Sequence, residues 1–336
     1  MVLHGIKKDS MKDEESQKAL QKKAKLYKEL LATVLGYKKE HNYRDGPLKH
    51  CAALLEINPD VSTAWNYRRM ALEARLESAT GEERIGLVMN EFTLTEKALQ
   101  KNPKSYCAWH HRKWLVLRGL SSPDTELYLC EKMLDFDERN FHCWEYRRFL
   151  AARMGVSDQD ELSFTTKKIE QNFSNYSAWH QRTLLLKRMQ EATIATAESD
   201  SSPHTGVHNV ALSSEKLDQE YDLVHQAFFT EPEDQSGWFY YLWLFGNTLH
   251  KSHLENGYTG KRVEEEIQIC REMLQLEPSS KWVLLALARL LVTRGAADLT
   301  SQAEMYSIYE KLMQIDPMRK LYYMEVKDKH IAFSSI

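Results

Sequence analysis

The sequence has 336 residues, of which 43% are hydrophobic and 28% are charged, and its formal net charge is −3 at pH 7. This composition is ordinary for a globular chain and leaves ample apolar residues for a packed core. A slightly acidic chain does not favour nucleic acid as a partner, and no apolar run is long enough to span a bilayer. We therefore expect no nucleic-acid partner and no membrane insertion.

The five cysteines are scattered without a CxxC pair, and the first residues, MVLHGIKKDSMKDEE, are charged rather than apolar. Scattered cysteines do not suit a zinc site, and a charged start is not typical of a signal peptide. We expect free thiols in a reducing compartment, a cytoplasmic location, and no metal site within this chain.

Glycine and proline are scarce, with 13 and 8 residues, which indicates an all-helical chain. Residues 1–44 are expected to hold an N-terminal segment and a long, charged leading helix over 10–43. Residues 45–330 are expected to form a repeat domain. Within it, residues 190–213 are rich in Ser, Thr and Ala and predict an exposed loop between the fourth and fifth repeats.

A tryptophan marks six copies of one repeat, and a weaker copy without tryptophan starts at Asp316. The six are Trp65, Trp109, Trp144, Trp179, Trp238 and Trp282. In the first four copies an arginine follows three residues later, on the same helical face, as a structural signature. These arginines are Arg68, Arg112, Arg147 and Arg182. Five prolines share one repeat position, where Asn, Asp or Glu followed by Pro predicts a helix start with proline at its first position.

An amphipathic segment precedes each of these starts, with apolar residues recurring at three and four spacing. Each repeat is therefore predicted to be a helix–turn–helix hairpin. One hairpin cannot bury its apolar face alone, so the hairpins stack. We predict an all-α fold, a curved right-handed α-solenoid of about seven hairpins.

The segment NPKSYCAWHHRKW (102–114) is the copy with the most residues that could carry chemistry, among them a lysine, a cysteine and two adjacent histidines. Its adjacent histidines, His110 and His111, point about 100° apart on a helix and are interpreted as packing residues. Lys104 is predicted in the first helical turn, where the helix dipole disfavours a cation. Such a turn, with free backbone N–H groups and a lysine, suits an anion such as a phosphate. A solvated surface lysine is the alternative from the residues alone.

The order PKSYCAWHHR, RNFHCWEYRR and SNYSAWHQR resembles the α subunits of protein prenyltransferases over residues 45–325. In that family the α subunit is a crescent of helical hairpins around a β subunit, which binds the catalytic zinc and most of the isoprenoid. The chain is most similar to the Rab type, geranylgeranyltransferase type II. Cys107 stands where the CaaX-type enzymes place a glutamine that binds a peptide carboxylate.

The resemblance implies an enzyme that works as an obligate heterodimer with the β subunit. A zinc-bound thiolate from a C-terminal cysteine of a Rab GTPase attacks geranylgeranyl diphosphate, the co-substrate, and displaces diphosphate. An escort protein presents the Rab. No leucine-rich or immunoglobulin-like domain is expected in this chain.

The resemblance also implies roles for individual residues. Lys104 approaches the diphosphate, with Tyr106 beside it, and both are expected to act in catalysis. Asn140 and His142 are expected at the mouth of the active site, with Phe141 between them in place of the tyrosine common in farnesyltransferase. His4, in MVLHG, is a candidate autoinhibitory ligand to the partner's zinc.

Two other readings remain open. The chain could be the α subunit shared by farnesyltransferase and geranylgeranyltransferase type I, or a non-enzymatic helical-repeat adaptor that binds peptides. Modification of a CaaX peptide without escort protein would favour the first, and failure to form a heterodimer with a β subunit would favour the second.

Overall fold

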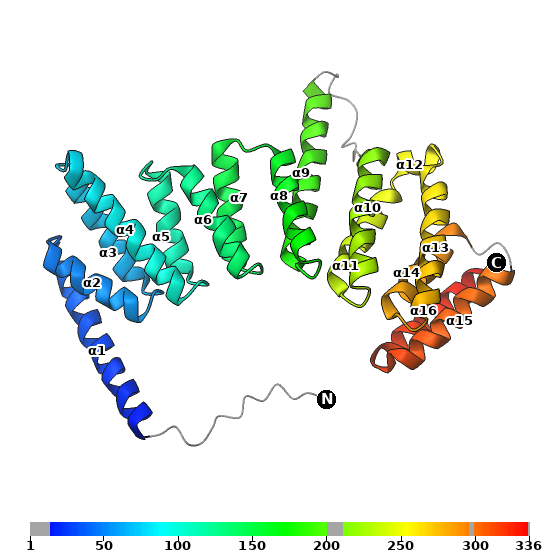
Figure 1. Cartoon of the computed structure of the whole chain (residues 1–336), viewed down its shortest axis with the longest axis horizontal. Coiled ribbons are helices and arrows are strands. Elements are labelled where there is room, and N and C mark those ends of the chain that lie inside the picture. The colour runs from blue at the N-terminus through cyan, green and yellow to red at the C-terminus, as the bar shows by residue number, and fades with distance from the viewer. Residues whose placement is uncertain (1–13, 200–210, 296–298, 335–336) are drawn as a thin grey trace. The chain divides into compact units, whose positions relative to one another are not determined.

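The structure is a computed structural model that describes residues 14–199, 211–295 and 299–334. All regular structure among these residues is helical, so the predicted all-helical repeat fold is confirmed (Figure 1). The chain divides after Met154 into two compact units. None of the helices in the described ranges could cross a lipid bilayer, because each is too short or too polar.

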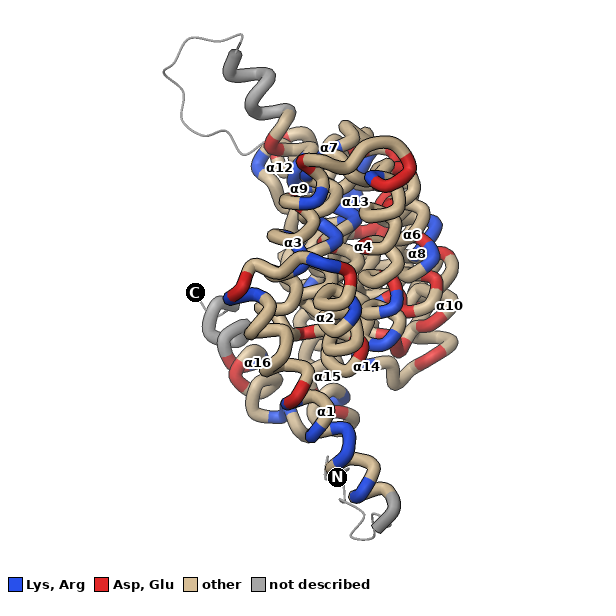
Figure 2. Tube along the Cα trace, turned by 90° about the vertical axis from the view of Figure 1, so that its left-hand side faces the viewer, with Lys and Arg blue, Asp and Glu red and all other residues tan. Residues whose placement is uncertain are grey.

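The first unit contains a leading helix and three hairpins (Figure 1). Its helices are α1 (Glu14–Lys39), α2 (Asp45–Ile57), α3 (Ser62–Leu76), α4 (Gly81–Lys101), α5 (Tyr106–Leu117), α6 (Pro123–Phe136) and α7 (Phe141–Met154). The second helices of successive hairpins pack together, α3 on α5 and α5 on α7. The leading helix α1 is rich in lysine (Figure 2), and Leu30 and Val34 in its C-terminal half are buried.

The second unit contains four hairpins, with the short helix α12 between the second and the third. Its helices are α8 (Asp158–Gln171), α9 (Tyr176–Ser199), α10 (Ser214–Thr230), α11 (Gln235–Thr248), α12 (Lys251–Glu255), α13 (Tyr258–Leu276), α14 (Lys281–Arg294), α15 (Leu299–Ile315) and α16 (Lys320–Ser334). Helix α9 continues to Ser199, so the first part of the loop predicted over 190–213 is helical, and residues 200–210 lie outside the described residues.

In the first five hairpins a repeat tryptophan joins the turn to the second helix. The indole N–H of Trp109 donates to the carbonyl of Pro103, six residues earlier, with 2.8 Å between Nε1 and O. The same bond, also at 2.8 Å, recurs in four other hairpins. Its pairs are Trp65–Pro59, Trp144–Glu138, Trp179–Phe173 and Trp238–Pro232. The prediction that this proline opens the second helix is therefore wrong for Pro59, Pro103, Pro232 and Pro278, which lie in the turns, and the carbonyls of the first three accept an indole proton. It holds for Pro317, which opens the short 3-10 helix Pro317–Arg319 ahead of α16.

The sixth repeat has a different register from the one predicted. Helix α14 begins at Lys281, with Ser280 at its N-cap, which places Leu284 at the position of the other repeat tryptophans. Leu284 is buried, whereas Trp282, two residues earlier, is only half-buried. The prediction that Trp282 occupies the repeat position of the other tryptophans is therefore wrong, because Leu284 fills that buried position.

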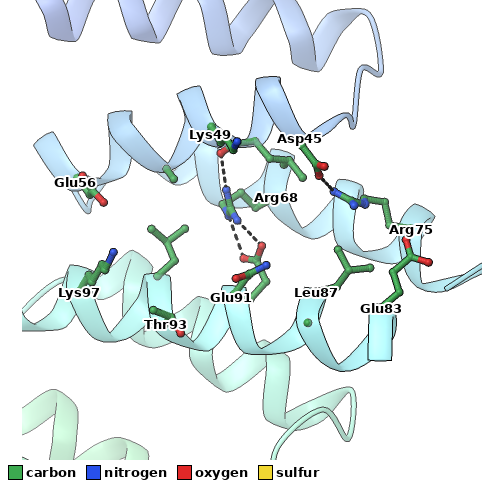
Figure 3. Close-up of a pocket in the computed structure, with 15 residues that line it drawn as sticks. Asp45, Lys49, Glu56, Arg68, Arg75, Glu83, Leu87, Glu91, Thr93 and Lys97 are labelled. Carbon is green, nitrogen blue, oxygen red and sulfur yellow. Dashed lines mark hydrogen bonds and ion pairs between the residues drawn. The ribbon is translucent and has the colours of Figure 1, made fainter. Parts of the chain in front are cut away.

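A buried carboxylate on the first helix of a hairpin joins three successive helices. Glu91 on α4 accepts from Arg68 Nε of α3 at 3.0 Å (Figure 3). It also lies 3.1 Å from His111 Nε2 of α5. The arrangement recurs twice, with tyrosine in place of histidine. These sets are Arg112–Glu126–Tyr146 and Arg182–Glu220–Tyr240, with Tyr–Glu distances of 2.7 Å. The repeat arginines therefore hold neighbouring hairpins together.

Candidate functional site

Lys104 lies in the turn between α4 and α5 rather than in the first turn of a helix. Helix α5 begins at Tyr106, and Ser105 is its N-cap, with Oγ accepting from Ala108 N at 3.3 Å. The side chain of Asn102 caps the turn instead of the helix, because its Oδ1 accepts from Lys104 N at 3.1 Å. The expected first-turn position of Lys104 is therefore wrong by two residues.

The backbone of this turn offers less to an anion than predicted. The N–H of Lys104 is bonded to Asn102 Oδ1, and the N–H of Ser105 is bonded to the Asn102 carbonyl at 3.0 Å. The N–H of Ala108 is taken by the Ser105 hydroxyl. Since these three amides already have acceptors, an anion at this turn would have to use the Lys104 ammonium or the N–H groups of Tyr106 and Cys107, which begin α5.

The side chain of Lys104 is 62% exposed, and its Nζ lies 4.0 Å from Asp137 Oδ2, in the turn before α7. Equivalent turns are joined in the same way, Asp60 to Asn102 and Ser174 to Glu231. The Lys104–Asp137 pair is therefore the contact between the α4–α5 turn and the α6–α7 turn that corresponds to these two. An exposed ion pair at this distance is worth at most about 1 kcal/mol, so a better anion can replace Asp137.

Three aromatic rings lie beside Lys104. Tyr106 is 68% exposed, and its ring meets the His142 ring edge-on at 4.1 Å between centroids. His142 in turn lies 3.9 Å from the ring of Phe141, which is half exposed. Burial lowers the pKa of His142 below its usual value, so the imidazole is neutral at pH 7. The accessible surface of this group is formed by Tyr106 and Phe141.

Asn140 is buried, and its side chain is fully used within the protein. Its Oδ1 accepts from the backbone N–H groups of His142 (3.1 Å) and Cys143 (3.2 Å) at the start of α7. Its Nδ2 donates to the carbonyl of Pro103 at 3.0 Å. Asn140 thus ties the start of α7 to the turn that carries Lys104.

Cys107, at the position of the CaaX-type glutamine, is half-buried, and its Sγ lies 3.6 Å from the backbone oxygen of Asp60. Burial and the Asp60 charge raise the pKa of the thiol, so it is a poor nucleophile at pH 7. A thiol is a weak hydrogen-bonding group and does not replace a glutamine amide.

Of the paired histidines, His111 packs as predicted, whereas His110 is exposed and contacts a surface arginine. His111 is fully buried between Glu91 and the ring of Trp65, at 4.6 Å between centroids. His110 Nδ1 lies 2.7 Å from Arg69 Nη2. Among the residues that the structure describes, no three His, Cys, Asp or Glu side chains gather as metal ligands. His4 lies outside the described residues.

A cavity of about 540 Å³ lies between α2, α3 and α4 (Figure 3), and Lys104, Tyr106, Asn140 and His142 are not among the residues that line it. Basic and acidic side chains line it in equal number, so it has no preference for an anion. The basic ones are Lys49, Arg68, Arg75 and Lys97, and the acidic ones are Asp45, Glu56, Glu83 and Glu91.

Two sets of residues were missed at the sequence level. The buried glutamates Glu91, Glu126 and Glu220 each stand eighteen residues before a repeat tryptophan, a fixed spacing that could have identified them. Asp60, which contacts the Lys104 turn, was read only as an acidic residue at the lysine's repeat position. Its contact with the next hairpin leaves no pattern in the sequence.

Five of the hairpins match the repeat of a known protein family. Five segments, residues 46–75, 88–119, 123–154, 158–189 and 217–248, match the protein prenyltransferase alpha subunit repeat. Each coincides with one hairpin, from α2–α3 to α10–α11. The fold and its turns therefore define a protein built from prenyltransferase alpha subunit repeats.

Two similar proteins indicate which type of prenyltransferase alpha subunit the chain is. The chain is 33% identical over 332 residues to the geranylgeranyl transferase type-2 subunit alpha of Dictyostelium discoideum, covering 97% of this chain and 100% of that protein. It is 48% identical over 250 residues to the type-2 subunit alpha 1 of Arabidopsis thaliana, covering 74% of this chain and 35% of that protein. The chain belongs to the family of geranylgeranyl transferase type-2 alpha subunits.

The chain spans the whole Dictyostelium relative but well under half of the Arabidopsis one, and 42% of the Sus scrofa type-2 subunit alpha, to which it is 41% identical. A solved structure of similar fold is the Candida albicans protein geranylgeranyltransferase-I complexed with GGPP. It matches with a TM-score of 0.66 and 21% identity over 90% of each chain. At this identity the likeness concerns the fold.

Proposed function

We propose that this chain is the α subunit of a Rab geranylgeranyltransferase. In this proposal it forms a heterodimer with a β subunit and transfers geranylgeranyl from geranylgeranyl diphosphate to C-terminal cysteines of Rab GTPases. An escort protein presents the Rab. The observation that carries the proposal is the end-to-end match to a type-2 alpha subunit, together with an exposed lysine on a fixed turn.

The proposed contribution of this chain is electrostatic. Negative charge grows on the leaving diphosphate as its bond to the isoprenoid breaks. A cation held beside that oxygen stabilises the transition state more than the bound substrate. Lys104 fits this role because its ammonium is exposed and its ion pair with Asp137 is weak enough to exchange for a diphosphate. The Tyr106 hydroxyl, on an exposed ring beside it, would donate to a phosphate oxygen.

Asn140 and His142 are proposed to shape the mouth of the site from beneath. Both are buried, Asn140 under the Lys104 turn and His142 against the Tyr106 ring. They would therefore hold Lys104 and Tyr106 rather than touch the substrate.

The zinc ion that the resemblance implies is assigned to the β subunit. The described residues of this chain do not provide a set of ligands for it, and His4 is proposed only as a contact from outside that set. Every step assigned to this chain concerns the diphosphate.

The test is co-expression with a prenyltransferase β subunit, followed by single-turnover prenylation of a Rab with its escort protein. The heterodimer should form, and Lys104→Ala should lower the chemical rate by about 10²- to 10³-fold, the usual effect of losing one preorganised charge-stabilising group. Arg139→Ala is the matched control, because Arg139 is an exposed cation at the same position of the next turn. Its rate should stay within about twofold of the unmodified enzyme.

Three outcomes would contradict the proposal. No stable heterodimer would favour the adaptor reading. Prenylation of a CaaX peptide without escort protein would favour the α subunit shared with farnesyltransferase. Such activity would contradict the expectation that Cys107, in place of the glutamine, cannot bind the peptide carboxylate. An unchanged rate for Lys104→Ala would remove the lysine from the reaction.

A further inference from the structure

The turn that carries Lys104 is bonded by side chains from the hairpin before it and the hairpin after it. The turn itself, residues 102–105, has one internal side-chain bond, from Lys104 N to Asn102 Oδ1. A turn of this length would otherwise move with the exposed ends of α4 and α5.

From the preceding hairpin, the carboxylate of Asp60 makes two bonds to this turn. Its Oδ1 accepts from the Ser105 hydroxyl at 2.6 Å, and its Oδ2 accepts from Asn102 Nδ2 at 3.1 Å. These two residues flank the Pro103–Lys104 pair, so one carboxylate fixes both ends of the turn. Hydrogen bonds to an ionised carboxylate are shorter and about twice as strong as neutral ones.

From the following hairpin, Asn140 Nδ2 donates to the carbonyl of Pro103 at 3.0 Å. The same carbonyl accepts the indole proton of Trp109 at 2.8 Å. Both lone pairs of this oxygen are therefore used, and the peptide bond that precedes Lys104 is fixed in orientation.

The equivalent turn of the second unit is bonded through different groups. There Ser174, at the repeat position of Asp60, donates from Oγ to Glu231 Oε2 at 2.7 Å, and its backbone carbonyl accepts from the Ser236 hydroxyl at 3.3 Å. That position carries no carboxylate. At the turn that presents Lys104, the carboxylate of Asp60 accepts from both Asn102 and Ser105.

We propose that Asp60 is a positioning residue for the reaction, because it holds the Lys104 turn so that the ammonium is aimed at the leaving diphosphate before substrate binds. This inference rests on the proposed role of Lys104. A misplacement of about 1 Å in a preorganised group reduces rate by about 10²-fold, while binding of substrate is affected much less.

Asp60 is suited to this test because it is exposed and lies outside the packed core. Its removal leaves the Trp109–Pro103 bond and the buried Arg68–Glu91 pair in place. The hairpin therefore has other bonds that maintain it when the carboxylate is absent.

The experiment is a double-mutant cycle in the heterodimer with Asp60→Ala and Lys104→Ala, measured by single-turnover transfer from geranylgeranyl diphosphate to a Rab–escort complex. Asp60→Ala should lower the chemical rate by about 10- to 10²-fold, with little change in the dissociation constant of geranylgeranyl diphosphate. In the Lys104→Ala background the same change should have less than about a twofold effect, because Asp60 acts through the lysine. A merely structural role would reduce both backgrounds alike.

Two further variants complete the design. Asp60→Asn keeps an oxygen for Ser105 but loses the second acceptor, so its rate should fall between those of the unmodified enzyme and Asp60→Ala, and this variant decides the matter if Asp60→Ala does not form heterodimer. Ser174→Ala, the matched control, removes the equivalent contact from a turn without predicted site residues and should leave the rate unchanged.

The outcomes separate this inference from the function on which it rests. An unchanged rate for Lys104→Ala removes both. If Lys104→Ala lowers the rate, the proposed function stands. The inference about Asp60 is then contradicted if Asp60→Ala has the rate of the unmodified enzyme, or if the effects of the two substitutions multiply in the double mutant.

Discussion

The hairpins α4–α5 and α10–α11 have the same internal bonds and expose different chemistry. In each, the tryptophan donates to the carbonyl six residues earlier. In each, a buried glutamate on the first helix is bonded by an arginine of the preceding helix and by the residue two positions after the tryptophan. At the turn, however, α4–α5 presents Lys104 and Tyr106, where α10–α11 has Glu233 and Gln235.

The difference teaches that scaffold and chemistry occupy separate positions of one repeat. The indole, the arginine and the glutamate are buried and set the packing. The positions of Lys104, in the turn, and of Tyr106, the first residue of the second helix, are exposed and differ between the two hairpins. A position that departs from the other copies on an exposed turn is thus informative about a site, whereas a departure in the buried set concerns packing.

The largest effect is expected when an arginine is removed from either hairpin's buried set. Arg68→Ala and Arg182→Ala should each lower the free energy of unfolding by about 3–5 kcal/mol, because Glu91 or Glu220 would stay buried without its charge partner. Urea unfolding of the purified protein measures this. Arg188→Ala, in an exposed pair with Asp158, is the control and should cost at most about 1 kcal/mol. Equal losses in all three would contradict the shared buried design.

Removing the indole N–H should have the next largest effect, and it should be larger at Trp238 than at Trp109. Trp238→Phe removes the indole donor of the Pro232 carbonyl, which costs about 1–3 kcal/mol when the group is left unsatisfied. After Trp109→Phe the Pro103 carbonyl still accepts from Asn140 Nδ2, so the loss should lie at the lower end of that range. Thermal or urea unfolding gives the difference, and a larger loss at Trp109 would contradict the second bond from Asn140.

The hairpins should differ in their response to pH, because His111 stands where α10–α11 has Tyr240. Burial lowers the pKa of His111, so between that value and about 6.5 the unfolded chain binds more protons than the folded one. Stability therefore falls as the pH drops below about 6.5. His111→Tyr should reduce this slope, by at most about 1.4 kcal/mol per pH unit. Unfolding from pH 5 to 8 measures it, and an unchanged slope would contradict the assignment.

The smallest effect on stability is expected from exchanging the exposed turn residues. Lys104→Glu and Glu233→Lys should each change the free energy of unfolding by less than about 0.5 kcal/mol, as is usual at exposed positions. Activity should nevertheless separate them, since Lys104→Glu should abolish transfer and Glu233→Lys should leave it intact. A stability loss above about 2 kcal/mol for either would mean that these positions belong to the scaffold.

The fold was largely predictable because the period and the tryptophan–arginine spacing report directly on helical packing. The helix start was misplaced at Pro59, Pro103, Pro232 and Pro278, because Asn–Pro or Glu–Pro is equally compatible with a helix start and with a turn. The sixth repeat was misaligned, since leucine fills the buried position and leaves no distinctive letter. Lys104 could be identified only with the help of the family resemblance, since Arg139 is a cation at the same repeat position. Asp60 could not be identified, because bonds between successive turns depend on how the hairpins stack.

The indole bond has a practical consequence. Each of the first five hairpins contains one tryptophan whose N–H is held by a turn carbonyl, at Trp65, Trp109, Trp144, Trp179 and Trp238. Such a proton exchanges with solvent only when its own turn opens, so the exchange rates of the five indole protons measure local opening, one for each hairpin. Their exchange rates would report how readily each hairpin turn opens, without an added label. They would also show which turn opens less often when a partner or a diphosphate binds.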